Sequence, residues 1–217
     1  MKRIASTVLC IVLIFSLSAC GNKTIEPDKS VQIASSQSET AESADNASNE
    51  SATDRTAHHI LVAYFSATGS TKAVAETIAS RISADTFEIT PKEPYTLTDL
   101  NYNDKNSRVS LEHNNLDGRN VELVTTTPDD FSGFDIVFVG YPIWWGDAAW
   151  VIDNFVKGND FTGKTVIPFC TSVSSDIGES ASNLAKMAGT GTWLEGKRFS
   201  GSASEDEISE WLTQLGL

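Results

Sequence analysis

The sequence has 217 residues, 40% of them hydrophobic, and a formal net charge of −13. Residues 58–217 alone hold 11 Lys and Arg against 22 Asp and Glu. This excess of acid argues against nucleic acid as a partner, because neutralising phosphates requires the opposite sign. It is compatible with docking to a basic redox partner, although such a balance more often serves solubility.

The first twenty residues have the features of an export signal. Lys2 and Arg3 precede an apolar run over residues 4–19 that is short for a membrane span. The run ends in Leu17-Ser18-Ala19-Cys20, which resembles the bacterial lipobox, in which the cysteine becomes the first mature residue and carries lipid. We therefore expect a lipoprotein signal peptide over residues 1–19 and lipidation at Cys20; an ordinary signal peptide is the alternative. The protein would be exported and would touch the membrane or envelope through its lipid anchor only.

A tether and a single domain are expected after Cys20. Residues 21–57 are rich in Ser, Ala, Asn, Glu and Asp and contain no aromatic residue. Such a composition cannot bury enough apolar surface to offset the entropy of ordering, so we expect a disordered tether over residues 20–57, beginning at the lipidated cysteine. Residues 58–217 hold all five Trp and all four Tyr, and their number suits one domain with one core.

Cysteine usage excludes a disulfide framework. Once Cys10 leaves with the signal and Cys20 is lipidated, Cys170 stands alone, and no CxxC metal motif is present. No metal site is expected. Cys170 is interpreted as a small buried strand residue; a thiol that takes part in redox chemistry is the alternative.

Strand and helix patterns alternate from His58 onward. Unbroken apolar runs indicate central strands covered on both faces, and apolar residues spaced three or four apart indicate helices. Ser204 and Glu207 form a capping-box pair that predicts the start of a terminal helix. The predicted strands are 59–65, 86–90, 134–140, 164–170 and, with an irregular centre, 192–199; the helices are 71–82, about 147–157, a helix ending near 187, and the terminal helix.

This alternation predicts an α/β fold, a doubly wound, mostly parallel sheet of five strands. Ligands of such sheets bind at the carboxyl ends of the strands, where the strand order reverses. Three loops follow predicted strands and are unusual in composition: 66–71, 141–147 and 171–178.

The first loop has the composition of a phosphate site. At a helix N-terminus the first amides have no partner within the helix, and the helix dipole favours an anion. Ser66, Thr68, Ser70 and Thr71 add hydroxyl donors, and Gly69 allows close approach of the backbone. The loop lacks the P-loop and G-x-G-x-x-G patterns, so a small monophosphate ester fits best. A serine- and threonine-rich helix cap without a ligand is the alternative.

Ser66-Ala67-Thr68-Gly69-Ser70-Thr71 after a buried strand resembles the flavodoxin phosphate loop, [ST]-x-T-G-x-T, which holds the phosphate of flavin mononucleotide (FMN). The likeness extends over residues 58–217. It implies a flavodoxin-like strand order of 2-1-3-4-5 and FMN as the cofactor.

The second loop offers flat aromatic partners for a flavin ring. It reads Tyr141-Pro142-Ile143-Trp144-Trp145-Gly146-Asp147, and stacking of aromatic rings contributes on the order of 1 kcal/mol beyond burial of area. Pro142 to Gly146 is similar to a loop in a subgroup of flavodoxin-like proteins. Pro94-Tyr95, and Arg108 with Glu112, also occupy positions typical of that subgroup. Packing of one indole into the core is the alternative.

The third loop departs from the subgroup. There the pattern is close to T-S-G-x-S-G-I-G, whereas this chain has Val173 and Asp176 in place of glycine. Val173 requires negative φ, and an inward-pointing Asp176 would lower the potential of a bound flavin. The flavin contacts expected here come from Thr171, Ser172, Ser174 and Gly178.

The resemblance implies a membrane-anchored, extracytoplasmic flavodoxin-like protein that carries electrons between redox partners. No side chain is expected to act as a catalytic acid or base, and the partner would be a redox protein or a membrane electron donor. Two alternatives remain: an FMN-dependent reductase of quinones or other small acceptors, and a redox-silent flavin-binding lipoprotein.

Overall fold

The computed structural model describes residues 58–217. The predicted signal peptide (1–19), the lipidation site at Cys20 and the tether (20–57) lie outside the described residues. Within residues 58–217, no helix is long and apolar enough to cross a membrane.

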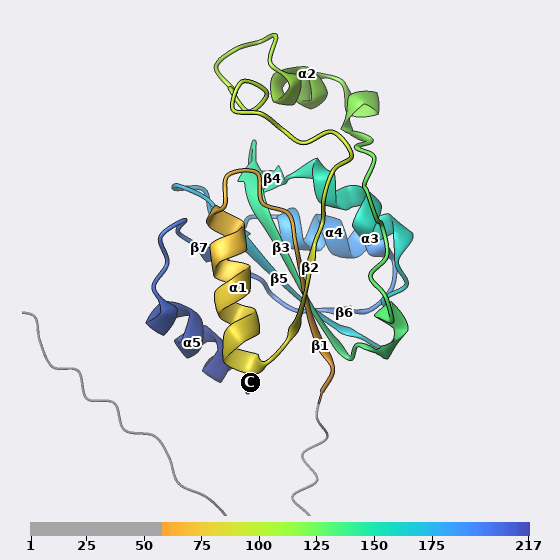
Figure 1. Cartoon of the computed structure of the whole chain (residues 1–217), viewed down its shortest axis with the longest axis vertical. Coiled ribbons are helices and arrows are strands. Elements are labelled where there is room, and N and C mark those ends of the chain that lie inside the picture. The colour runs from red at the N-terminus through yellow and green to blue at the C-terminus, as the bar shows by residue number, and fades with distance from the viewer. Residues whose placement is uncertain (1–57) are drawn as a thin grey trace, which may run out of the picture. The chain divides into compact units, whose positions relative to one another are not determined.

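The core of the fold is a parallel sheet in the order β2-β1-β3-β5-β6 (Figure 1), which confirms the predicted 2-1-3-4-5 arrangement. Its central strands are mostly apolar because helices cover both faces of the sheet. The five strands are β1 (Ile60–Tyr64), β2 (Asp85–Glu88), β3 (Ile136–Trp144), β5 (Thr165–Thr171) and β6 (Thr192–Trp193).

Two further strands bring the sheet to seven, whereas five were predicted. β7 (Lys197–Phe199) pairs with β5 beyond β6, so the predicted last strand is interrupted at its centre, as expected. β4 (Asp147–Ala148) pairs antiparallel with the end of β3 and was not predicted.

The predicted loop 141–147 and the predicted helix 147–157 are both wrong in their bounds. β3 continues through Trp144, and Asp147 and Ala148 return alongside it as β4. The amide of Ala149 then donates to the carbonyl of Pro142 (3.1 Å). Because this hairpin occupies the backbone groups, helical structure begins only with the 3₁₀ turn η3 (Trp150–Ile152) and α3 (Asp153–Gly158).

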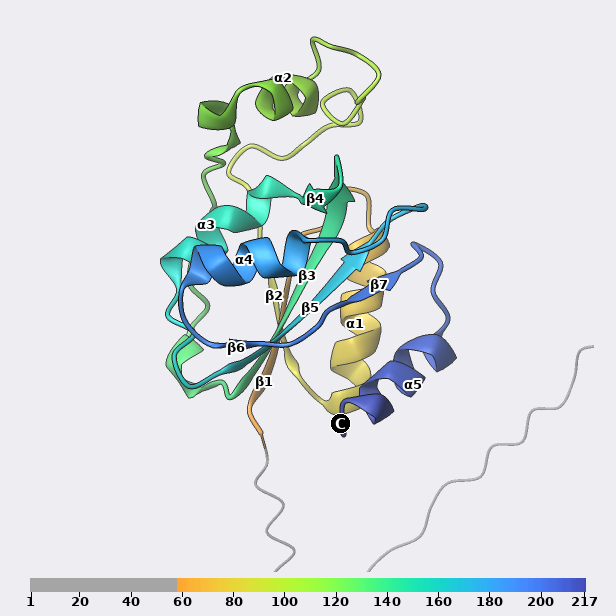
Figure 2. The same cartoon turned by 180° about the vertical axis from the view of Figure 1, so that it is seen from behind.

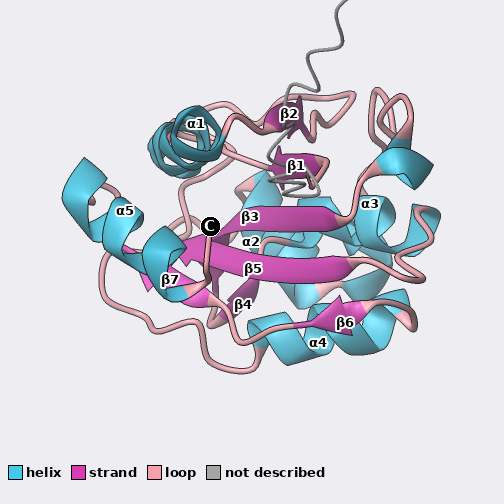
Figure 3. Cartoon of the chain, turned by 90° about the horizontal axis from the view of Figure 1, so that it is seen from below, coloured by secondary structure: helices cyan, strands magenta, loops and turns pink. Residues whose placement is uncertain are grey.

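Two helices cover each face of the sheet (Figures 1 to 3). α1 (Ser70–Ile82) and α5 (Glu205–Gln214) pack one face through Val74, Ile78, Ile208 and Trp211. α3 and α4 (Ser180–Ala188) pack the other face, with Phe155 and Leu184 in its core. Ser204 Oγ accepts from the amide of Glu207 (3.2 Å), so the predicted cap of the terminal helix is confirmed.

The connection between β2 and β3 carries α2 (Arg108–Asn114) beyond the carboxyl ends of the strands (Figure 1). Two 3₁₀ turns follow it, η1 (Leu116–Arg119) and η2 (Phe131–Gly133). Buried Glu112 holds this segment: its carboxylate accepts from Tyr95 Oη (2.6 Å), Arg108 Nε (2.7 Å) and Trp150 Nε1 (2.8 Å). A buried carboxylate satisfied three times fixes α2 against the domain.

Candidate functional site

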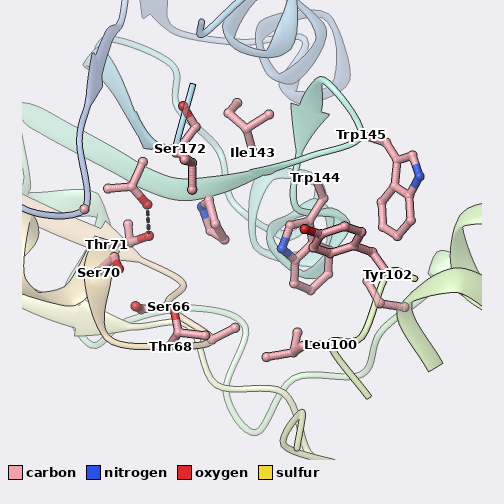
Figure 4. Close-up of a pocket in the computed structure, with 16 residues that line it drawn as sticks. Ser66, Thr68, Ser70, Thr71, Leu100, Tyr102, Ile143, Trp144, Trp145 and Ser172 are labelled. Atoms are coloured by element: carbon pink, nitrogen blue, oxygen red, sulfur yellow. Dashed lines mark hydrogen bonds between the residues drawn. The ribbon is translucent and has the colours of Figure 1, made fainter. Parts of the chain in front are cut away.

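A pocket of about 380 Å³ opens at the carboxyl end of the sheet (Figure 4). All three predicted loops contribute to it, together with the segment before α2. Its sixteen lining residues are Ser66, Ala67, Thr68, Ser70, Thr71, Leu100, Tyr102, Val109, Pro142, Ile143, Trp144, Trp145, Thr171, Ser172, Val173 and Gly201.

One end of the pocket is the N-terminus of α1. Gly69 precedes the helix in the left-handed region (φ 93°), and no side chain caps the helix. By contrast, Ser107 and Ser204 cap α2 and α5. Ser66 Oγ accepts from the amide of Gly69 (3.1 Å), which closes the loop on itself. An uncapped helix start without acidic residues in its first turn is suited to bind an anion.

Two buried threonines connect the first and third loops. The hydroxyls of Thr71 and Thr171 lie 2.8 Å apart and share a hydrogen bond. Gly201, after β7, lies close to the same corner, since a Cβ there would lie 3.0 Å from Ser70 Oγ. The polar end of the pocket is therefore tightly assembled from three carboxyl-end segments.

The other end of the pocket is aromatic, and its two indoles differ. Trp144 is half-buried and packs edge-on against Phe65 (5.7 Å), Tyr95 (5.3 Å) and Trp150 (4.8 Å between ring centroids). Trp145 remains 45% exposed. One indole thus belongs partly to the core, while both line the pocket.

Arg198 holds the third loop in place through hydrogen bonds. Its Nε donates to Ser172 Oγ (3.0 Å), and its Nη2 donates to the carbonyls of Ser172 (2.7 Å) and Val173 (2.8 Å). The Val173 side chain is fully exposed, and the exposed carboxylate of Asp176 accepts from the amide of Ile177 (2.8 Å). The two residues that replace glycine therefore leave the pocket open.

Most of the predicted site residues line the pocket, but Gly69, Gly146, Ser174 and Gly178 do not. The three glycines among them have positive φ and shape the loops instead: Gly69 (93°), Gly146 (81°) and Gly178 (54°). Ser174 is exposed.

Sequence reasoning did not include five lining residues among the expected contacts: Leu100, Tyr102, Val109, Val173 and Gly201. Gly201 had a usable signal, since Ser200-Gly201-Ser202 follows the last predicted strand and thus also lies at a carboxyl end.

Two buried ionisable groups next to the pocket, Cys170 and Tyr141, have raised pKa values. Cys170 is fully buried, and this burial raises the pKa of its thiol to about 12. Burial also raises the pKa of Tyr141, whose hydroxyl shares a hydrogen bond with Ser180 Oγ (3.0 Å). In the part of the chain that the structure describes, no group of three His, Cys, Asp or Glu residues is placed to hold a metal ion.

None of the sixteen lining residues is charged, although residues 58–217 are strongly acidic. Hydroxyl groups and a helix N-terminus lie at one end and indole rings at the other. This division fits a ligand with a phosphate ester at one end and a flat apolar ring at the other.

Fold and site together define a doubly wound α/β protein with a ligand site at the carboxyl edge of its parallel sheet. The profile of the flavodoxin family matches residues 59–215, and the chain belongs to this family.

Solved structures of similar proteins agree with this assignment. A candidate flavoprotein from Bacteroides eggerthii DSM 20697 is 40% identical, with a TM-score of 0.66 over 73% of this chain and 98% of that one. A second, from Bacteroides uniformis ATCC 8492, is 35% identical, with a TM-score of 0.66 over 72% and 98%. A flavoprotein from Lactobacillus acidophilus NCFM in complex with FMN is 20% identical, with a TM-score of 0.52 over 71% and 99%, and shares the fold. No curated protein is significantly similar in sequence.

Proposed function

We propose that this chain binds FMN in the carboxyl-end pocket and carries electrons between redox partners. The observation that carries the proposal is the division of an uncharged pocket into a hydroxyl-lined helix N-terminus and an indole-lined wall. FMN has a phosphate ester and a flat ring at its two ends, and the solved Lactobacillus flavoprotein of the same fold holds FMN.

Each part of the pocket has a distinct role toward the cofactor. The start of α1 holds the phosphate through backbone amides and hydroxyls, without a lysine. The indoles exclude water and present flat surfaces to the ring, and the third loop, fixed by Arg198, supplies polar backbone groups. FMN itself supplies the redox chemistry when it is bound. The residues with these roles are Ser66, Thr68, Ser70 and Thr71 for the phosphate, Trp144 and Trp145 for the ring, and Thr171 and Ser172 in the third loop.

Electron transfer is favoured over proton chemistry because no Asp, Glu, His, Lys or Cys side chain lines the pocket. Cys170 is buried and stays protonated at neutral pH, since its pKa is about 12. A carrier requires an accessible ring edge and brief docking of limited area rather than a closed substrate site.

Titration with FMN followed by stepwise anaerobic reduction tests the proposal. We expect the purified protein to bind FMN, with a visible spectrum that changes in two separated one-electron steps. Reduction by a single two-electron step would instead favour a reductase of quinones or other small acceptors. Flavin that exchanges readily and shows no change of potential would favour a redox-silent binding protein. Absence of binding would refute the assignment.

We also propose that the protein is exported and lipid-anchored at Cys20. The support is the sequence Leu17-Ser18-Ala19-Cys20 after a basic and apolar leader. In cells fed a clickable fatty acid, the wild-type chain should take up the label and partition into detergent, and the Cys20→Ser variant should do neither. Equal labelling of both chains would contradict lipidation at this residue.

A further inference from the structure

The indole of Trp145 is stacked on a histidine from a distant segment. The imidazole of His113, on α2, lies 4.4 Å from the indole centroid at an interplanar angle of 17°. Trp150 lies behind both rings, at 5.9 Å from Trp145 and 6.4 Å from His113. Trp145 thus lines the pocket (Figure 4), and its indole contacts α2 through the His113 ring.

The backbone of Trp145 adopts an unusual conformation. Trp144 pairs with Asp147, so Trp145 and Gly146 form a two-residue hairpin turn, with φ of 48° and 81°. Positive φ at both positions is the pattern of a type I′ turn, where Asn, Asp and Gly are favoured and a bulky residue is strained. A tryptophan at this position needs a compensating interaction, and such strain is concentrated at functional sites.

A network of hydrogen bonds holds the end of α2 that carries His113. Arg119 closes the carboxyl end of α2, donating from Nη2 to the carbonyl of His113 (2.9 Å) and from Nε to that of Glu112 (3.3 Å). Glu112 is in turn held by Tyr95, Arg108 and Trp150. The backbone that carries the imidazole is therefore held in place at this end of α2.

We propose that His113 is a positioning residue that holds the Trp145 indole at the mouth of the pocket before a ligand arrives. An indole that is already oriented loses less entropy when a flat ring binds beside it, and this raises affinity. The role in FMN binding rests on the function proposed above, whereas the effect on the indole does not require FMN. Stacked aromatic pairs are worth enough to change the dissociation constant by about three- to tenfold.

A double-mutant cycle on the full-length protein tests this positioning role. The variants are His113→Ala, Trp145→Asn and both together; asparagine suits the turn, so the hairpin is retained. The first measurement is made without FMN: acrylamide quenching and near-ultraviolet circular dichroism, with the Trp145 contribution taken as the difference between chains with and without Trp145. We expect His113→Ala to make Trp145 more accessible and to reduce its dichroism, and to have no such effect in the Trp145→Asn background.

The second measurement is the FMN dissociation constant. We expect His113→Ala to weaken binding by about three- to tenfold when Trp145 is present and by less than about twofold when it is absent. His113→Phe, which keeps a flat ring, should restore both indole order and affinity. Leu111→Ala is the matched control, since this exposed residue lies on α2 two positions away and faces another direction.

The outcomes separate the two proposals. If the wild-type protein fails to bind FMN, the proposed function is refuted, while the FMN-free measurement still decides whether His113 orders the indole. Unchanged quenching and dichroism in His113→Ala would overturn the positioning role. An equal loss of FMN affinity in both backgrounds would also overturn it, because His113 would then act without Trp145.

Discussion

The substitution Glu112→Gln removes one hydrogen bond from the cluster that holds α2 over the pocket and keeps the others. Oε2 of Glu112 accepts from Tyr95 Oη (2.6 Å) and Trp150 Nε1 (2.8 Å), and Oε1 accepts from Arg108 Nε (2.7 Å). A glutamine that keeps its oxygen at the Oε2 position keeps the first two bonds. Its NH₂ group then faces the Arg108 guanidinium. Both groups are hydrogen-bond donors, so no hydrogen bond forms between them.

The expected loss of stability is about 2–3 kcal/mol. A hydrogen bond to a charged group contributes about 1.5–3 kcal/mol, and removing one partner of a buried pair costs about 3–5 kcal/mol. The side chains of Arg108 and Glu112 are 23% and 10% exposed. Water can therefore solvate the guanidinium that has lost its partner, and the cost of the substitution stays below the upper end of that range. The loss belongs to the native state, because both residues are fully hydrated in the unfolded chain.

Urea denaturation followed by tryptophan fluorescence measures this loss, with Glu122→Gln as the matched control. Lys92 and Glu122 make a similar contact (3.0 Å), but their side chains are 58% and 73% exposed, so that substitution should cost less than about 0.5 kcal/mol. If Glu112→Gln costs no more than this control, the cluster does not hold α2 and the reasoning fails.

Three further predictions concern the core and its ionisable groups. A methyl group on Gly140 would lie 2.2 Å from Cζ of Phe169, so Gly140→Ala should cost about 1–3 kcal/mol or more, partly restored by Phe169→Leu; unchanged urea unfolding would contradict this. Burial raises the pKa of Asp153 from 3.8 to about 6. The folded state therefore binds this proton more tightly, and the contribution of Asp153 to stability should fall by roughly 2–3 kcal/mol as pH rises from about 4 to 6. The Asp153→Asn variant should lack this fall when unfolding is measured as a function of pH, and it should be more stable than wild type at pH 7. A pH dependence of its stability like that of wild type would contradict the prediction. Iodoacetamide should modify the buried Cys170 thiol only after unfolding, as peptide mapping can show; rapid labelling of the native protein would refute this.

The sequence predicted the sheet and the phosphate end of the pocket because both depend on local patterns. An apolar run followed by hydroxylated residues and a helical repeat marks a strand, a turn and a helix start, and these are the β1–α1 junction. The wrong bounds around residue 147 have a different origin. Asp147 is typical of a helix N-cap, yet its backbone pairs with Trp144 across a turn that a tryptophan rarely occupies.

The wall made by Leu100, Tyr102 and Val109 lies in a long connection without a periodic pattern. Its position depends on the buried carboxylate of Glu112, one of whose three donors, Trp150, comes from a distant part of the chain. Such contacts are set by tertiary packing, which a single sequence does not display. The stack of His113 on Trp145 was missed for the same reason.

The parallel direction of β1, β3 and β5 places the start of the domain and the pocket at opposite edges of the sheet. Residues 58 and 59 lead into β1 at the amino edge of the sheet (Figure 1), whereas the pocket opens at the carboxyl edge. If the chain is anchored through its N-terminus, as proposed above, the attachment lies at the edge of the domain opposite the pocket. A partner in the surrounding space would meet the pocket directly, while a donor embedded in the anchoring membrane could reach it only if the domain turned over.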